Sequence, residues 1–210
     1  MSASGGTADR REVIETAALI AALALYIAFE PEIHGRPALI LPIVAACAGY
    51  ALWAVCTGRA SRAQLGLRAD NLATATRAAL RVYGPAAGAV LVWFAASPVP
   101  APPADFYLTL AVYPFWGIAQ QFVFQSLLHT RLIRLGTAPW SILITAAAYT
   151  AVHWHSPRLM AITFPAGLIN GWLFLRRPNI IPLGIAHGVL GAMVYYLLFG
   201  EDPMARFLNG

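Results

Sequence analysis

The sequence has no lysine, only two cysteines and little charge for its length. Its 210 residues carry 14 basic and 9 acidic side chains, which is 11% of the chain, against roughly 25% in an average soluble domain. Hydrophobic residues make up 59%, and the mean hydropathy is +0.64. A water-soluble globule of this size could not bury so much apolar surface, and the composition also excludes disordered, collagen-like and disulfide-rich chains. We therefore expect a polytopic membrane protein in which residues 1–210 form a single membrane-embedded domain.

The two cysteines predict no chemistry. Cys47 and Cys56 lie in one apolar stretch without CxxC spacing, so they indicate neither a disulfide nor a metal site. Every basic residue is arginine, and the arginines flank apolar segments. The net charge of +5 is therefore better explained by membrane topology than by binding of nucleic acid.

Apolar stretches of the length needed to cross a bilayer, about 17–25 residues, recur along the chain after a polar tail at residues 1–12. We predict an all-α transmembrane bundle of about seven spans, within a range of six to eight. The expected spans are residues 13–29, 37–56, 83–97, 106–135, 139–155, 159–175 and 180–199. Leucines alternate with arginines over residues 57–84. This pattern predicts an amphipathic helix on the cytoplasmic surface, with a solvated linker as the alternative.

The positions of the arginines predict the orientation. With seven spans, all arginines except Arg36, Arg158 and Arg206 fall on one side of the membrane. That side should be cytoplasmic, which places the N-terminus in the cytoplasm. We expect a multi-pass protein of a bacterial inner membrane, whose partners are the lipid bilayer and a hydrophobic peptide or membrane protein, without nucleic acid.

Polar side chains occur inside the predicted spans, where burial in lipid is costly and makes them functional candidates. Gln121, Gln125 and His129 are spaced to share one face of the fourth span. The other members of this set are Gln120 in the same span, His153 and His155 in the fifth, and His187 in the seventh. The alternative is that they only form hydrogen bonds between helices.

The predicted depths of these residues agree only in part. Counted from the cytoplasmic ends at about 1.5 Å per residue, Gln120 and His153 lie roughly 21–23 Å along their spans. His187 lies only about 10 Å along the last span, a difference of roughly two helical turns. A single shared polar site is the working hypothesis.

Three short motifs follow one another in the second half of the chain. They are QQFVFQ at Gln120–Gln125, YTAVH at Tyr149–His153 and HGVLG at His187–Gly191. Their order and spacing resemble the EExxxR, FxxxH and HxxxN motifs of the CAAX protease and bacteriocin-processing family, also called Abi, and the resemblance is best over residues 106–199. It implies an intramembrane endopeptidase in which the first glutamate activates water, two histidines assist, and the asparagine helps to hold the developing oxyanion.

The differences from the family pattern fall on the positions that carry this chemistry. They are Gln120 and Gln121 in place of the two glutamates, Gln125 in place of arginine, and Gly191 in place of asparagine. Of the polar motif positions, only His153 and His187 keep the family residue. A glutamine amide is no general base near neutral pH, and none of the nine acidic residues is predicted at the depth of the histidines. Because a neutral cluster costs less in lipid than a half-removed charged one, the pattern indicates a site that changed as a unit.

Two hypotheses follow. In the first, the chain is a pseudoprotease without a cofactor, which keeps a polar cavity for a hydrophobic peptide, helix or ligand and acts as a scaffold, assembly or regulatory protein. In the second, it is an intramembrane endopeptidase that uses His153 and His187. There a zinc ion held by His153, His155 and His187, with His129 as a further candidate, would lower the pKa of bound water toward about 7. His153 and His155 would point about 160° apart on a regular helix, so this site requires the helix to end or distort there.

Overall fold

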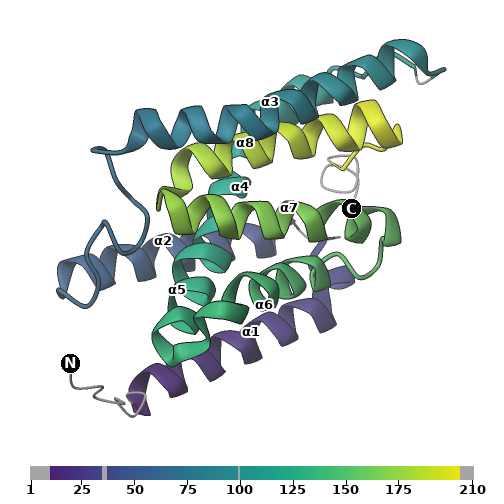
Figure 1. Ribbon diagram of the computed structural model, residues 1–210. Coiled ribbons are helices and arrows are strands. Elements are labelled where there is room, and N and C mark those ends of the chain that lie inside the picture. Colours follow the sequence, from purple (N-terminus) through teal and green to yellow (C-terminus); the bar gives the residue numbers. More distant parts are fainter. Residues whose placement is uncertain (1–9, 35–36, 99, 204–210) are drawn as a thin grey trace. The chain divides into compact units, whose positions relative to one another are not determined.

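The computed structural model describes residues 10–34, 37–98 and 100–203. Most of the predicted polar tail lies outside these ranges, as do Arg36 and Arg206, two arginines of the predicted outer side. The described residues form helices joined by turns, without strands (Figure 1). The α-helices are α1 (Arg10–His34), α2 (Pro37–Cys56), α3 (Leu72–Ala96), α4 (Asp105–Gln121), α5 (Thr130–Leu132), α6 (Ala138–Ala151), α7 (Pro157–Arg176) and α8 (Ile180–Met193). The π-helices are η1 (Phe122–His129), η2 (Ile133–Thr137) and η3 (Val194–Phe199).

The predicted all-α fold is confirmed. Four segments are long and apolar enough to cross a membrane, namely Glu12–Phe29, Leu72–Ala96, Pro157–Arg176 and Ile180–Phe199. A shorter apolar segment, Ala45–Cys56, lies in α2. The total of seven spans remains a prediction.

The segment predicted as a separate amphipathic helix divides into two parts. Residues 57–71 form turns and bends, and residues 72–84 are the first turns of α3. Gly58 follows the end of α2 with a φ of +68°, a left-handed conformation that commonly ends a helix. The interfacial position of this segment remains a prediction.

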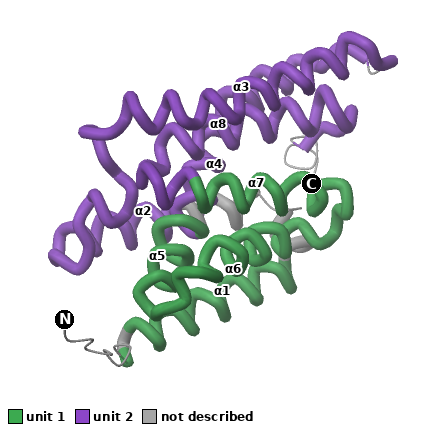
Figure 2. The backbone as a smooth tube through the Cα atoms, viewed as in Figure 1, with its two compact units in different colours: residues 1–30, 124–172 green, residues 31–123, 173–210 purple. Residues whose placement is uncertain are grey.

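The chain folds as two compact units (Figure 2). Unit 1 comprises Met1–Glu30 and Phe124–Trp172, and unit 2 comprises Pro31–Val123 and Leu173–Gly210. The positions of the two units relative to one another are not determined. The boundary at Val123 falls at the start of η1, so the long helical stretch that begins with α4 contributes to both units.

Unit 2 is built on close contact between α4 and α8. A Cβ atom added to Gly117 would lie 2.3 Å from the carbonyl oxygen of Gly184, and one added to Gly188 would lie 2.4 Å from that of Tyr113. A Cβ atom on Gly184 would lie 2.5 Å from the Cα atom of Ile118. The two backbones approach so closely because these positions have no side chain, as in other membrane helix pairs with small residues four apart. This antiparallel register fixes which residues of α4 and α8 meet.

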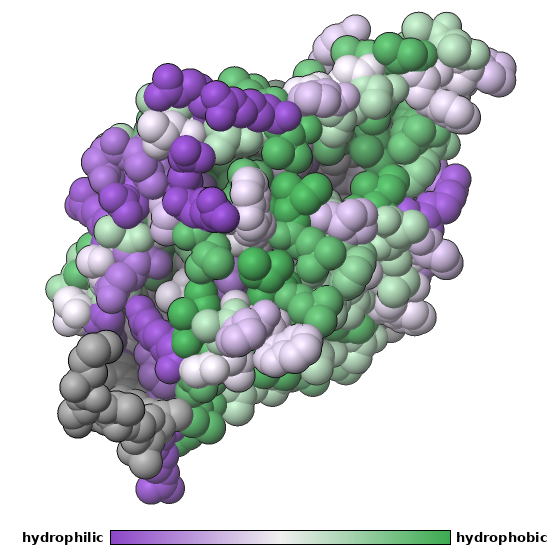
Figure 3. All heavy atoms as spheres, viewed as in Figure 1, coloured by the Kyte–Doolittle hydropathy of each residue, from purple (hydrophilic) through white to green (hydrophobic). Residues whose placement is uncertain are grey.

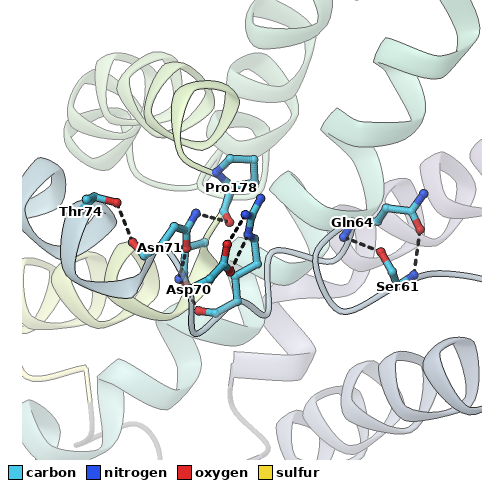
Figure 4. A network of polar contacts seen from close by, with 8 residues as sticks. Ser61, Gln64, Asp70, Asn71, Thr74 and Pro178 are labelled. Atoms are coloured by element: carbon cyan, nitrogen blue, oxygen red, sulfur yellow. Dashed lines mark hydrogen bonds and ion pairs between the residues drawn. The ribbon is translucent and has the colours of Figure 1, made fainter.

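The segment between α2 and α3 is tied to the turn between α7 and α8 by a polar network (Figure 4). The Nδ2 group of Asn179, which is 2% exposed, donates to the carbonyl oxygen of Arg68 at 2.7 Å and to Oδ1 of Asn71 at 2.8 Å. Asn71 in turn donates from Nδ2 to the carbonyl oxygen of Pro178 at 3.2 Å. The starts of α3 and α8 therefore lie at the same end of unit 2.

Unit 1 joins α1 to the helices that follow Val123. A buried cluster formed by Phe124, Leu128, Leu132, Tyr149 and Val152 packs against Leu19, Leu23, Tyr26 and Ile27 of α1. Two ion pairs lie beside it. Arg131 donates to Glu15 at 3.1 Å, and Arg134 donates to Glu12 at 2.9 Å. The arginines predicted at the cytoplasmic end of the fourth span thus meet the start of the first span.

Candidate functional site

In unit 2, the structure brings together Gln120 of α4 and His187 of α8. The Nε2–H group of His187 donates to Oε1 of Gln120 at 2.9 Å. Both side chains are partly exposed. Gly188 follows His187 in sequence and permits the close approach of α4 and α8. The glycine contacts that set the packing of these helices therefore also allow Gln120 and His187 to meet.

The depth difference predicted between Gln120 and His187 does not keep their side chains apart, because the two are hydrogen-bonded. The prediction counted the depth of Gln120 from Leu135, as if residues 106–135 formed one straight span. In the structure α4 ends at Gln121, η1 follows, and the residues after Val123 belong to unit 1. The α4 part packs on α8, with Gly117 against Gly184 near the start of α8. The side chains of Gln120 and His187 therefore meet within unit 2.

The second motif glutamine is buried in the same unit. Gln121 is 1% exposed, and its Oε1 atom accepts no hydrogen bond from any residue that the structure describes. A buried amide oxygen without a donor costs about 1–3 kcal/mol. A ligand group that donates a hydrogen bond to this oxygen, such as a peptide N–H, would therefore be stabilising.

Gly191 occupies the asparagine position of the family motif, and the packing of α8 does not require a glycine there. A Cβ atom at this position would meet only Tyr113, at 3.7 Å from Cδ1, which is ordinary van der Waals contact. Gly188, one turn earlier, has no such room. The loss of the polar side chain at Gly191 is therefore not explained by the packing of α8.

In unit 1, Gln125 takes part in a fully buried polar chain. His129 is hydrogen-bonded through Nδ1 to Oε1 of Gln125 at 3.0 Å and through Nε2 to Oγ of Ser141 at 3.1 Å. The exposed fractions of the Gln125, His129 and Ser141 side chains are 2%, 0% and 0%. The predicted proximity of Gln125 and His129 is therefore present in the structure. Ser141 was missed, because a serine after Pro-Trp at a helix start has no sequence signal for this contact.

His153 and His155 lie in the turn between α6 and α7 in unit 1. The helix ends at Ala151, four residues before the predicted end, because the chain must turn before Pro157 begins α7. The predicted divergence of the two histidines on a regular helix therefore does not apply. The His153 ring stands edge-on to Tyr149, with centroids 5.6 Å apart and an interplanar angle of 89°, and His155 is exposed.

No group of three or more His, Cys, Asp or Glu suited to a metal ion occurs among the residues that the structure describes. Of the predicted zinc ligands, His153 and His155 belong to unit 1 and His187 belongs to unit 2. The described residues thus do not form the zinc set, and its assembly remains a prediction.

The carboxylates of unit 2 whose side chains the structure describes lie at helix ends or in the segment between α2 and α3. Asp105 begins α4, about 22 Å along the helix from Gln120, and Glu201 and Asp202 follow η3. Asp70 lies in the 57–71 segment, where hydrogen bonds from the Arg68 guanidinium hold the pKa of its carboxyl below the usual range. Within the described part of unit 2, the neighbour of His187 at the motif position is therefore an amide.

Comparison with known proteins agrees with the motifs. Residues 102–193 match the model of a family described as type II CAAX prenyl endopeptidase Rce1-like. This part of the chain is therefore similar to that family. The Rce1-like region includes every motif position from Gln120 to Gly191, so the resemblance seen in the sequence is confirmed. No curated protein and no solved structure matches the chain.

The Rce1-like region and the four apolar helices together identify a membrane protein. Its orientation remains a prediction. In unit 1, Arg131 and Arg134 meet the start of α1. In unit 2, the segment between α2 and α3 meets the end of α7.

Proposed function

We propose that the protein is an integral membrane pseudoprotease that binds a hydrophobic peptide or transmembrane helix at the Gln120–His187 pair without cleaving it. The observation that carries the proposal is the 2.9 Å hydrogen bond from His187 to the Gln120 amide. The family description names an endopeptidase, whose chemistry requires a group that takes a proton from water. Here an amide stands at that position.

The reaction needs a general base within hydrogen-bond reach of the water, about 2.6–3.2 Å. A glutamine amide does not accept a proton at neutral pH, and the carboxylates of unit 2 whose side chains the structure describes lie at helix ends or in the segment between α2 and α3. Donation from His187 to Gln120 also fixes the imidazole against a neutral partner. This pair can orient a substrate-like group but has no carboxylate to activate water.

Binding is supported by the same groups. Gln120 and His187 are partly exposed, and Gln121 offers a buried amide oxygen that lacks a donor among the described residues. A peptide backbone has N–H groups to donate and carbonyl groups to accept, so it satisfies both kinds of group. An apolar peptide or helix would also suit the lipid environment of the spans. We infer a scaffold, assembly or regulatory role.

The test uses the purified full-length protein in proteoliposomes and a fluorescent prenylated CAAX peptide. We expect binding without cleavage, and about tenfold weaker binding by His187→Ala, which corresponds to one lost hydrogen bond of about 1.4 kcal/mol. Gly191→Ala is the matched control on the same helix and should bind normally. Cleavage that disappears in His153→Ala or His187→Ala would instead establish the endopeptidase hypothesis, and its sensitivity to a chelator would establish the metal version.

A gain-of-function variant tests whether the site has kept its protease geometry. Gln120→Glu combined with Gln121→Glu restores the two carboxylates of the family motif. We expect cleavage of the same peptide above the level of the unmodified protein, measured by mass spectrometry of the products. An inert double variant that still binds the peptide would show that the geometry has also been lost.

A further inference from the structure

Unit 2 has charge of opposite sign at its two ends. We use the term basic end for residues 57–81 and 176–180, which include the start of α3 and the turn before α8. Its charged residues are Arg59, Arg62, Arg68, Asp70, Arg77, Arg81, Arg176 and Arg177. At the other end, where α3 and α8 finish, the described charged residues are Asp105, Glu201 and Asp202. Figure 3 shows hydrophilic residues gathered over the start of α3 and the segment before it, while much of the remaining face is hydrophobic.

The basic end is held together and coincides with the start of two candidate spans. Asn179 joins the two parts by its hydrogen bond to Asn71 at 2.8 Å. The apolar segments Leu72–Ala96 and Ile180–Phe199 both begin here. Their common start places the basic end at the depth of the lipid headgroups, if these segments cross the membrane side by side.

Several of these arginines are exposed and have no acidic partner among the described residues, and they include Arg77, Arg81 and Arg177. Arg68 differs, because it pairs with Asp70. Arg77 and Arg81 lie four residues apart and thus on one face of α3. Next to them, the exposed fraction of Leu72 is 42% and that of Leu80 is 59%. Exposed leucine between unpaired arginines is typical of a helix surface at the boundary of headgroups and acyl chains.

A groove beside α3 provides an apolar surface next to one of these charges. It is a shallow, open depression whose lining includes Ala75, Ala78, Ala79, Leu183 and Arg177. The alanines of α3 give the groove a small, apolar lining, and the Arg177 guanidinium lies in the same lining. A ligand that fits both parts has an anionic group joined to a hydrocarbon chain. Free phosphate has no hydrocarbon chain, so it would fit only the charged part of the groove.

We propose that the basic end of unit 2 binds the phosphate headgroup of an anionic phospholipid, with Arg77, Arg81 and Arg177 as its ligands and the groove beside Ala78 receiving the start of an acyl chain. Guanidinium groups bind phosphate oxygens strongly and in fixed geometry. The acidic residues at the other end of unit 2 would repel the same lipid. The site therefore selects one leaflet, independently of whether the Gln120–His187 pair binds a peptide.

The experiment titrates the purified full-length protein in detergent with dioleoylphosphatidylglycerol or dioleoylphosphatidylcholine and counts bound lipids by native mass spectrometry. The two lipids have the same acyl chains, so a difference reports the headgroup charge. We expect tighter binding of phosphatidylglycerol. Each arginine replaced by glutamine should weaken it about fivefold, the factor that corresponds to about 1 kcal/mol per basic residue near an anionic surface. Arg77→Gln with Arg81→Gln should thus weaken binding about 25-fold.

Two matched variants control for folding and for nonspecific charge. Arg177→Lys keeps the charge but loses the planar guanidinium, so it should weaken binding of phosphatidylglycerol less than Arg177→Gln does. Arg158→Gln removes an exposed arginine near the start of α7, at the opposite end of that helix from Arg177, and should have no effect. Equal affinity for the two lipids, or equal losses in Arg158→Gln and Arg177→Gln, would overturn the proposal. Displacement of the lipid by inorganic phosphate, but not by chloride at the same ionic strength, would assign the site to free anions instead.

Discussion

The polar side chains around the motif glutamines differ between the two units. In unit 1, His129 lies between Gln125 and Ser141, and all three are buried. The arginines Arg131 and Arg134 are paired with glutamates of α1. In unit 2, Gln120 and His187 are partly exposed, and several arginines of the basic end have no acidic partner among the described residues.

This difference distinguishes two roles of polar residues in an apolar chain, one structural and one in ligand binding. Buried polar groups that satisfy one another mainly specify the fold. Polar groups that remain accessible, or buried without a donor as Gln121 is, are available to a ligand. We therefore assign a structural role to the polar chain of unit 1 and a binding role to the pair in unit 2. The following predictions test this assignment of roles.

The largest effect is expected where unit 2 depends on backbone contact. Gly188→Ala would place a Cβ atom 2.4 Å from the carbonyl oxygen of Tyr113, which forces α4 and α8 apart and separates Gln120 from His187. We expect a loss of about 3 kcal/mol in stability together with loss of peptide binding, measured by thermal unfolding in detergent and by fluorescence titration. Gly191→Ala, whose Cβ atom has room, should change neither. Equal stability of the two variants would contradict the close packing.

The next effect is expected in the buried chain of unit 1. His129→Ala removes a fully buried ring and leaves Gln125 and Ser141 without their shared partner. Since each orphaned buried group costs about 1–3 kcal/mol, we expect a loss of roughly 2 kcal/mol in stability. Prenylated-peptide binding should remain within about twofold of the unmodified protein. If His129→Ala abolished binding while leaving the unfolding temperature unchanged, the division of roles between the units would be wrong.

A smaller effect distinguishes paired from unpaired arginines. The Arg131 side chain is 11% exposed and that of Glu15 is 34% exposed, so Arg131→Gln leaves a partly buried carboxylate without its cation. We expect a loss of about 1–2 kcal/mol, between the values for exposed and buried pairs. Arg177→Gln should change stability by less than about 0.5 kcal/mol, because it removes an exposed side chain. Thermal unfolding of the two variants tests this, and equal losses would show that Arg177 has a structural role.

Much of this architecture was accessible from the sequence, because long apolar runs and motif spacing are local signals. They predicted the helices at 157–176 and 180–199 to within a few residues, and the Rce1-like region was recognised from QQFVFQ, YTAVH and HGVLG. The pairing of Gln120 with His187 was expected only as part of one shared site. Its register is set by Gly117, Gly184 and Gly188, whose contacts depend on which helices become neighbours.

Other features had no local signal. The end of α6 at Ala151 and the contact of His129 with Ser141 depend on packing between segments. The change from α-helix to π-helix after Gln121 divides a stretch that hydropathy presents as one span. Residues 57–84 were predicted as a separate amphipathic helix because their leucines are interleaved with arginines. The inclusion of residues 72–84 in α3 means that the helix continues across Pro85, although proline has no N–H group to donate there, and periodicity alone does not reveal this.

The smallest expected effect concerns Asp70, the one acidic residue of the basic end. Hydrogen bonds from Arg68 lower the pKa of Asp70 in the folded protein, so the unfolded state binds more protons as the pH falls below about 4. The stabilisation is therefore present above the unfolded pKa and is lost as the pH falls through the folded one. Asp70→Asn should cause a slight loss of stability near pH 6 and a smaller loss near pH 3, because the stabilisation fades as the pH falls below the unfolded pKa. Thermal unfolding at the two pH values measures this difference, and a constant deficit would exclude the ion pair as its cause.

The same substitution should have the opposite effect on lipid binding. Asp70 offsets one positive charge at the basic end, so Asp70→Asn should strengthen the binding of phosphatidylglycerol by up to about fivefold at neutral pH. A gain in affinity together with a loss in stability would show that Asp70 stabilises the loop at the expense of lipid binding. If Asp70→Asn weakened lipid binding instead, the Arg68–Asp70 pair would be needed to shape the basic end. Unit 2 would then, like unit 1, depend on a salt bridge between its own residues.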